Sequence, residues 1–231
     1  MVDVADAGSA GTATAEPEVT AVRAPAASAG ADVGERIYDA ALVLVARWGV
    51  SKTTLADVAR EAGCARATVY RAFPGGKQHL FQALAARELA AYLAAIIDAI
   101  DEADDLEDAL TRALVVASRL LADHDAAQFV LDHEPELLVP FLSFKHVDVL
   151  YGHTTATVGP HLERFLPAAR AGWTAEWAAR LFISYLFNPD PEIDLGDVAG
   201  ARSLVARYLL PAFRTTTHPP SAPHRSKGAT P

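Results

Sequence analysis

The sequence predicts an all-α protein, on three observations. Hydrophobic residues make up 51% of its 231 residues and charged residues 21%, a balance typical of a folded globular chain. Alanine is abundant, and it has the highest intrinsic helix propensity. Apolar residues recur at helical spacing, whereas the strict alternation of half-buried strands is hard to find. We therefore expect helices around a sizeable buried core.

The two ends of the chain differ in composition from its middle. Residues 1–33 are rich in Ala, Gly, Thr, Pro and acids, and residues 215–231 (TTTHPPSAPHRSKGATP) have a similar polar character. Such segments cannot bury enough apolar surface to offset the entropy of ordering, so both are predicted to be disordered tails. Between them we place a small domain over residues 34–80 and a larger one over residues 81–214.

The first predicted helix of the small domain has one continuous apolar face. Asp32 and Glu35 are spaced as a capping box at its start, and Gly49 is placed to end it. The side chains expected to face the core are Ile37, Ala41, Leu44, Val45 and Trp48.

Two shorter helices follow, joined by a tight turn. The second helix begins at Thr54, whose hydroxyl can accept a hydrogen bond from the amide of Asp57, and it ends at Gly63. The third lies in RATVYRAF, where Val69 and Phe73 share a face toward the core. This pattern predicts a helix-turn-helix, whose second helix can enter a DNA major groove ~12 Å wide.

A long helix is predicted from Lys77 onward, after Pro74-Gly75-Gly76 breaks the preceding run. Two dozen residues would span roughly 36 Å, enough to join two ends of the molecule. Its apolar face consists of Leu80, Phe81, Leu84, Leu89, Tyr92, Leu93, Ile96, Ile97 and Ile100. Further helices are predicted over residues 105–123, 125–133, 135–157, 174–187 and 197–213, which makes the second half a helical bundle.

Charge is distributed unevenly along the chain. Residues 34–80 contain seven basic and four acidic side chains, a net charge of +3, whereas the whole chain carries −9. The remainder therefore carries −12. A basic module on an acidic body is expected to bind polyanions through one end only.

Several classes of protein find no support in the sequence. Cys64 is the single cysteine, so no internal disulfide can form and a reducing compartment is expected. No apolar run approaches ~18 residues and no signal peptide is recognisable, which predicts a cytoplasmic protein without a membrane partner. The spacing of His133, His146 and His153 matches no known metal-ligand set. We predict no metal, no cofactor and no catalytic residue, because no catalytic motif is recognisable.

The segment TTLADVAREAGCARATVYRAFPGGKQHLF resembles the DNA-binding signature of TetR-family transcriptional regulators. The shared features are paired threonines, an Ala-Gly pair, Thr-x-Tyr-x-x-Phe and a lysine that opens a long helix, within residues 35–84. The resemblance implies a mainly helical homodimer with a C-terminal ligand domain, usually repressing transcription until a small molecule binds. By position, it implies phosphate contacts from Thr54, Thr68, Tyr70 and Lys77, and it places Arg66 and Arg71 on the recognition helix.

The chemistry of these side chains suits DNA. Arginine can bridge guanine edges with two hydrogen bonds, threonine can bond a base edge or a phosphate, and tyrosine can reach a phosphate. Two positions depart from the family pattern. Ala65 stands where a serine or threonine often caps the recognition helix, a cap typically worth ~1 kcal/mol. Ala72 stands where a histidine often precedes the phenylalanine.

We therefore expect a ligand-responsive dimeric repressor that a small, largely apolar molecule releases from its DNA operator. Dimerisation is expected through helices 174–187 and 197–213, in a four-helix contact. The expected ligand-pocket residues are Phe129, His133, Phe144 and Trp177. Two alternatives stay open: a DNA-independent helical small-molecule-binding protein and, less favoured, a small helical enzyme.

Overall fold

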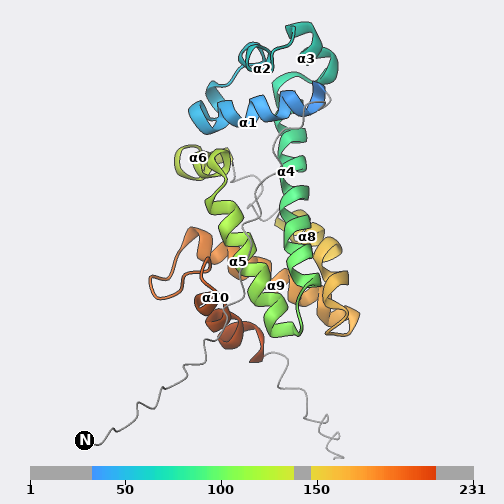
Figure 1. Ribbon diagram of the computed structural model, residues 1–231, viewed down its shortest axis with the longest axis vertical. Coiled ribbons are helices and arrows are strands. Elements are labelled where there is room, and N and C mark those ends of the chain that lie inside the picture. The colour runs from blue at the N-terminus through green and yellow to red at the C-terminus, as the bar shows by residue number, and fades with distance from the viewer. Residues whose placement is uncertain (1–32, 138–146, 212–231) are drawn as a thin grey trace, which may run out of the picture.

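The computed structural model describes residues 33–137 and 147–211, and every regular element in these ranges is helical, as predicted. Figure 1 shows α1, α2 and α3 together at one end of α4, with α5, α8, α9 and α10 gathered toward its other end. The bounds are α1 Val33–Lys52, α2 Leu55–Glu61, α3 Arg66–Ala72, α4 Gly76–Asp101, α5 Leu106–Ala122, α6 Asp125–His133, η1 Pro135–Leu137, α8 Val147–Leu162, α9 Ala168–Phe187, α10 Val198–Leu204 and η2 Val205–Leu209. The predicted tails lie outside the described residues, except for Val33, which begins α1.

The local signals at α2 and α3 are confirmed. The Thr54 side chain accepts from the Asp57 amide, and the Asp57 carboxylate accepts from the Thr54 amide, which completes a capping box. After α2, Gly63 adopts a φ of 63°, a backbone conformation that favours glycine. Val69 and Phe73 are buried as expected. The capping box fixes α2, and the buried side chains of Val69 and Phe73 hold α3; both helices are short enough to be marginal in isolation.

Helix α1 differs from its prediction at its C-terminal end. Gly49 has φ 82° and ψ 168°, so the helix is interrupted there, and one more turn follows to Lys52. Trp48 is 37% exposed, so the expectation that it faces the core is wrong. The physical reason is that Leu44, one turn earlier, is the last α1 residue in the core of this unit. The Trp48 ring instead lies beneath the Arg47 guanidinium, 5.9 Å from its centroid.

Helix α4 contributes to two separate cores. Leu80 and Leu84 pack with α1, α2 and α3, whereas Leu93, Ile96 and Ile100 pack in the C-terminal bundle. By length and composition alone α4 is apolar enough to cross a membrane, which the sequence prediction did not anticipate. Its buried residues belong to both cores. The helix therefore links the two units mechanically.

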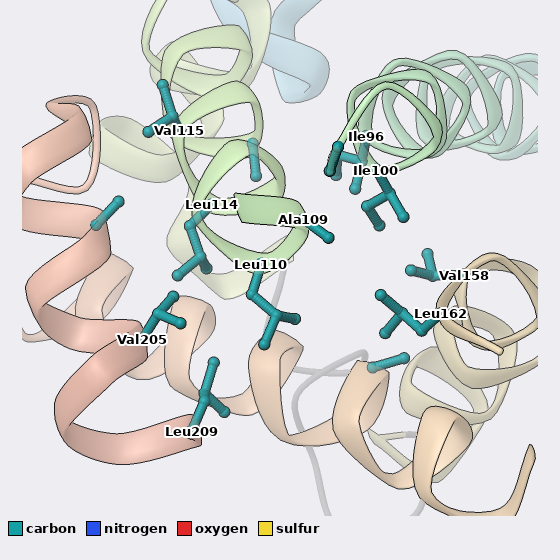
Figure 2. Close-up of a cluster of buried hydrophobic side chains, with 14 of the residues drawn as sticks. Ile96, Ile100, Ala109, Leu110, Leu114, Val115, Val158, Leu162, Val205 and Leu209 are labelled. Atoms are coloured by element: carbon teal, nitrogen blue, oxygen red, sulfur yellow. The ribbon is translucent and has the colours of Figure 1, made fainter. Parts of the chain in front are cut away.

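The C-terminal bundle surrounds this lower part of α4. In Figure 2, Ile100 of α4, Leu110 of α5 and Leu162 of α8 project into a shared apolar interior. Helices α8 and α9 approach closely where two glycines meet: a Cβ on Gly159 would lie 3.3 Å from the Cα of Gly172. Helix α9 begins at Ala168, directly after its N-cap Pro167, and therefore starts earlier than the predicted residue 174.

The remaining bundle helices agree with prediction to different degrees. The helices predicted over 105–123 and 125–133 are present as α5 and α6. The segment 135–157 contains η1 and the start of α8, with residues 138–146 outside the described part of the chain. The last predicted helix is α10 followed by the π-helical turn η2.

Candidate functional site

The outer face of α3 is the first candidate site. Arg66, Tyr70 and Arg71 are exposed, and Thr68 is half-buried. The helix is anchored from below by Val69, which is fully buried. With one face buried and the other open, α3 presents its polar side chains in the way a recognition helix must.

Phe73 ties α3 to both neighbouring long helices. Its ring meets the edge of Tyr38 from α1 at a centroid distance of 5.5 Å and that of His79 from α4 at 5.8 Å. Edge-to-face ring pairs of this kind add to the stability gained by burial. At the other end, Ala65 is the N-cap of α3 and supplies no side-chain hydrogen bond, as its sequence predicts.

Two other predicted DNA contacts lie at helix starts and have structural partners. The Thr54 hydroxyl donates to Asp57 at 2.6 Å, and this hydrogen bond is the main reason that the pKa of Asp57 is lowered. The Lys77 ammonium donates to the carbonyl oxygen of Ser51 at 2.8 Å. Because an ammonium has three N–H groups, this bond leaves Lys77 further donors.

A carboxylate from the bundle side holds the end of α1. Glu134, directly after α6, accepts from the amide of Val50 at 2.7 Å and from that of Ser51 at 2.9 Å. Glu134 is only 7% exposed to solvent. A Cβ on Gly49 would lie 2.7 Å from the Phe129 ring and 2.8 Å from the Glu134 carboxylate. We call Gly49, Val50, Ser51 and Glu134 the α1–α6 clamp.

The electrostatics of the clamp favour the charged form of Glu134. Burial by itself would raise its pKa, but hydrogen bonds from Ser51 and Val50 and the nearby charge of Lys77 outweigh burial, and the pKa is lowered. The same Lys77 binds the Ser51 carbonyl. Together with Lys77, the clamp therefore joins three segments, namely the end of α1, the start of α4 and the end of α6. Sequence reasoning missed Glu134 because its partners lie 83 and 84 positions away.

A cavity of about 440 Å³ lies beside the clamp, which we call the junction cavity. Its walls come from α1, α4, α5, α6 and α9, and α1 contributes Leu42, Val45 and Val50. Nearly all lining side chains are apolar. Its volume lies within the range typical of small-molecule sites, ~300–1,000 Å³. One wall thus belongs to the same helix that supports the helix-turn-helix.

A polar pair interrupts this apolar wall. The Nε2 atom of His124 lies 3.3 Å from Oε2 of Glu88, while its Nδ1 accepts from the Ala127 amide at 3.2 Å. Because Nδ1 accepts, Nε2 carries the proton and donates to Glu88. This hydrogen bond lowers the pKa of Glu88 and raises that of His124. The pair is a polar feature that sequence reasoning did not identify.

A second cavity of about 160 Å³, the bundle cavity, lies farther along α4. Ile96 and Ile100 of α4, with Val158 and Leu162 of α8, line it, and Figure 2 shows these side chains directed toward a common space. The Tyr92 hydroxyl donates to the Ala117 carbonyl at 3.0 Å, and burial raises the pKa of this tyrosine. The cavity wall is therefore apolar almost throughout.

Three of the four predicted pocket residues are described, and they lie away from the walls of both cavities. Phe129 stacks on His133 with centroids 4.4 Å apart, and His133 is exposed. Trp177 is 43% exposed and lies 5.7 Å from Trp173, ring to ring. None of these three is among the side chains lining the two cavities. Phe144 lies outside the described residues. The wide apolar face of α4, which contributes to the walls of both cavities, would have predicted their position better than the aromatic residues did.

Large apolar side chains are exposed on the last two helical segments. Trp173, Trp177 and Phe187 lie on α9, and Tyr208 lies in η2; each is between 43% and 50% exposed. Among residues 33–137 and 147–211, no group of three or more His, Cys, Asp or Glu side chains is arranged to hold a metal ion. His146 lies outside these ranges.

Known proteins resemble this chain in sequence over the helix-turn-helix and the start of α4. The profile of bacterial regulatory proteins of the tetR family matches residues 37–84. A helix-turn-helix-type transcriptional regulator of Mycobacterium tuberculosis strain H37Rv is 36% identical over 94 residues, which are 40% of this chain and 47% of the relative. A Mycobacterium bovis regulator of the same type is 37% identical over the same shares. The chain spans about half the length of the curated relatives it matches.

Solved structures extend the likeness to the bundle. The TetR family repressor AlkX from a Dietzia strain, implicated in biodegradation of n-alkanes, is 25% identical, with a TM-score of 0.57 over 77% of this chain and 95% of its own. The fatty acid degradation regulator FadR from Bacillus halodurans shares the fold, with 22% identity and a TM-score of 0.55 over 79% and 98%. On the helix-turn-helix geometry and these matches, residues 37–84 form a helix-turn-helix unit of the TetR family of transcriptional regulators, and the described part of the chain has the fold of that family.

Proposed function

We propose that the protein is a dimeric, ligand-responsive repressor that binds DNA through α3 and leaves its operator when an apolar molecule fills the junction cavity. The observation that carries the proposal is the position of that cavity, whose wall includes Leu42, Val45 and Val50 of α1. We call α1, α2, α3 and the start of α4, which share one core, the DNA-reading unit. A ligand in the junction cavity touches α1 and therefore this unit. The family consists of regulators, so the chain is not an enzyme.

The exposed face of α3 supports DNA binding. Arg66 and Arg71 project from a helix whose opposite side is anchored by Val69, and residues 34–80 carry a net positive charge on an acidic chain. Phosphate attraction would bring this end of the protein to DNA, and base contacts from the arginines would select the site. A transcriptional regulator of this kind acts in the cytoplasm.

Exposed aromatic side chains support dimerisation. Trp177 and Phe187 on α9 and Tyr208 in η2 lie on the segments where the sequence predicts a four-helix contact. Aromatic residues are enriched in the buried centres of protein interfaces. A symmetric pair would place two α3 helices in successive major grooves about 34 Å apart.

Release by an apolar ligand follows from the cavity and the clamp. A ligand can shift the protein only by its differential affinity for the two states. In this proposal the liganded state moves α4 and α6 relative to α1, through the Glu134 contacts, and changes the spacing of the two α3 helices. AlkX, a repressor of similar fold, is linked to n-alkane metabolism, which supports an apolar effector here.

A DNA-independent ligand-binding protein is the second candidate. The uncapped Ala65 and the exposed Ala72 favour it, because each removes a feature that helps the family bind DNA. Both candidates share the junction cavity. They differ in whether α3 reads DNA.

Selection of genomic fragments bound by the full chain separates the two candidates. We expect a specific duplex whose affinity falls steeply as salt rises, and a salt dependence that decreases by about one counterion in Lys77→Ala. Arg71→Ala is expected to cost about 1–3 kcal/mol and to relax specificity at one base pair. Arg112→Ala, a charge-matched change on α5, is the control and should leave binding unchanged. Failure to recover any specific duplex would contradict the repressor proposal.

A further inference from the structure

The two cavities are adjacent along α4. Four side chains, Leu89 and Tyr92 of α4 with Phe182 and Ile183 of α9, line both of them. All four are half-buried. They form a constriction between a cavity of about 440 Å³ and one of about 160 Å³. A side-chain rotation at this constriction would join the two spaces, and rotamer changes of this kind are fast.

The joined space is long rather than round. On α4 its lining runs from Phe81 to Ile100, and a helix rise of 1.5 Å per residue makes that interval about 28 Å. From Glu88 to Ile100 the same rise gives about 18 Å. Extended backbone covers about 3.6 Å in three bonds, so a trans carbon chain of about 15 bonds spans this distance. A compact ligand would fill only the junction cavity.

The polar pair sets the chemistry of one end of the ligand. Glu88 lines the junction cavity, and its carboxylate already accepts from His124 and from the Arg87 guanidinium at 3.1 Å, which lies behind the lining. An anionic end would be repelled by Glu88, and a cationic end would compete with Arg87 and His124 for the same carboxylate. A hydroxyl can donate to the free lone pairs of Glu88 without either penalty. An uncharged hydrogen-bonding end suits the site best.

We infer that the effector is a long, unbranched hydrocarbon chain with one uncharged hydrogen-bonding end, held with that end at Glu88 and His124 and its tail passing between Leu89 and Phe182 into the bundle cavity. This inference rests on the proposed function, because it names the class of molecule that would act at the same site. A fatty alcohol has this chemistry, and its tail would meet apolar side chains almost throughout.

The test uses the full chain and a series of alcohols. Octanol, dodecanol and hexadecanol compete with a bound anilinonaphthalene dye, and adamantanol serves as a compact apolar competitor. Each fully buried methylene contributes about fourfold in affinity, so the four extra methylenes of hexadecanol would give up to about 250-fold over dodecanol. We expect a gain of at least about tenfold. An affinity that does not depend on chain length, or adamantanol binding as tightly as hexadecanol, would overturn the inference.

Two variants test where the tail and the polar end of the bound alcohol lie. Ala178→Leu adds volume in the bundle cavity and should weaken hexadecanol about tenfold while octanol is unaffected. Ala94→Leu, an exposed change on α4, is the matched control and should change neither. Hexadecanoate should bind more weakly than hexadecanol to the wild type, and Glu88→Gln should remove that difference. Equal binding of the two head groups to the wild type would contradict the assignment of the polar end.

A parallel measurement of DNA affinity separates this inference from the proposed function. If hexadecanol binds as described but leaves the operator complex intact, the ligand class is supported and the release mechanism is wrong. If a specific operator is found and no alcohol of any length binds, the proposed DNA-binding function is retained and the inference about the ligand is wrong.

Discussion

The DNA-reading unit and the C-terminal bundle solve the packing problem differently. In the first, α1, the two short helices α2 and α3, and the start of α4 close around fully buried Val58, Val69 and Leu80. In the bundle, longer helices enclose the bundle cavity of about 160 Å³. Together with α1 they also line the junction cavity of about 440 Å³. Protein interiors are normally close-packed, so a hollow interior with apolar walls indicates space for a ligand. A filled core holds α3 in one position, while a hollow core can respond to what enters it.

The largest expected effect follows from the filled core. Leu80→Ala should lower the free energy of unfolding by about 2–5 kcal/mol, because Leu80 is fully buried among close neighbours. Leu110→Ala, beside the bundle cavity, should cost less, since fewer packing contacts are lost. Urea unfolding followed by circular dichroism measures both. Equal losses at the two positions would show that the bundle is as tightly packed as the DNA-reading unit.

Loss of the clamp carboxylate should come next. Glu134→Ala removes charge-assisted hydrogen bonds to two backbone amides, each typically worth about 1.5–3 kcal/mol, and leaves those amides without this acceptor. The pKa of Glu134 is lowered on folding, so its contribution is present above its ordinary value of 4.5 and is lost as the pH falls. Glu134→Gln should therefore flatten the acid side of the stability profile. An unchanged pH profile would show that the ionised Glu134 carboxylate does not contribute to stability.

Gly49→Ala tests the same junction from the α1 side. The new methyl group would meet Phe129 and Glu134 at less than 3 Å, at a φ of 82° that side chains rarely adopt. Backbone strain of this kind costs about 1–3 kcal/mol. Gly152→Ala, on α8 with open space around its Cβ, is the matched control. Thermal unfolding of the two variants should separate clearly, and equal midpoints would contradict the close approach.

The smallest expected effect is a gain in the DNA-reading unit. Ala65 has the extended backbone of an N-cap but no side-chain acceptor, so Ala65→Ser should stabilise α3 by about 1 kcal/mol. Hydrogen exchange of the α3 amides measures this locally. A rise in protection confined to α3 is expected, and no change would show that the missing cap is compensated elsewhere.

The same contrast explains which features the sequence could predict. The Thr54 cap and the Gly63 turn depend on neighbours within a few residues, and the shared face of Val69 and Phe73 follows from helical spacing; all were predicted. The Glu134 contacts join segments more than 80 positions apart, and no periodicity carries that information. Trp177 was assigned to a pocket because it is aromatic, although burial depends on the bundle as a whole.

The bundle boundaries were predicted less well for a related reason. The segment Ala168–Gly172 carries no strong apolar periodicity of its own, and in the structure it packs closely on α8, where Gly159 meets Gly172. The cavities arise from what several helices leave unfilled, so no single helix encodes them. Only the wide apolar face of α4 pointed toward them from the sequence.

The link between the hollow region and DNA is tested most directly by measuring hexadecanol affinity with and without a saturating selected operator duplex. Coupling between two binding sites is reciprocal, so the operator should weaken hexadecanol binding by the same factor by which hexadecanol weakens operator binding. That factor is expected to be about 5–150, as in typical allosteric proteins. Equal hexadecanol affinity for the free and DNA-bound protein would contradict a repressor controlled through the junction cavity.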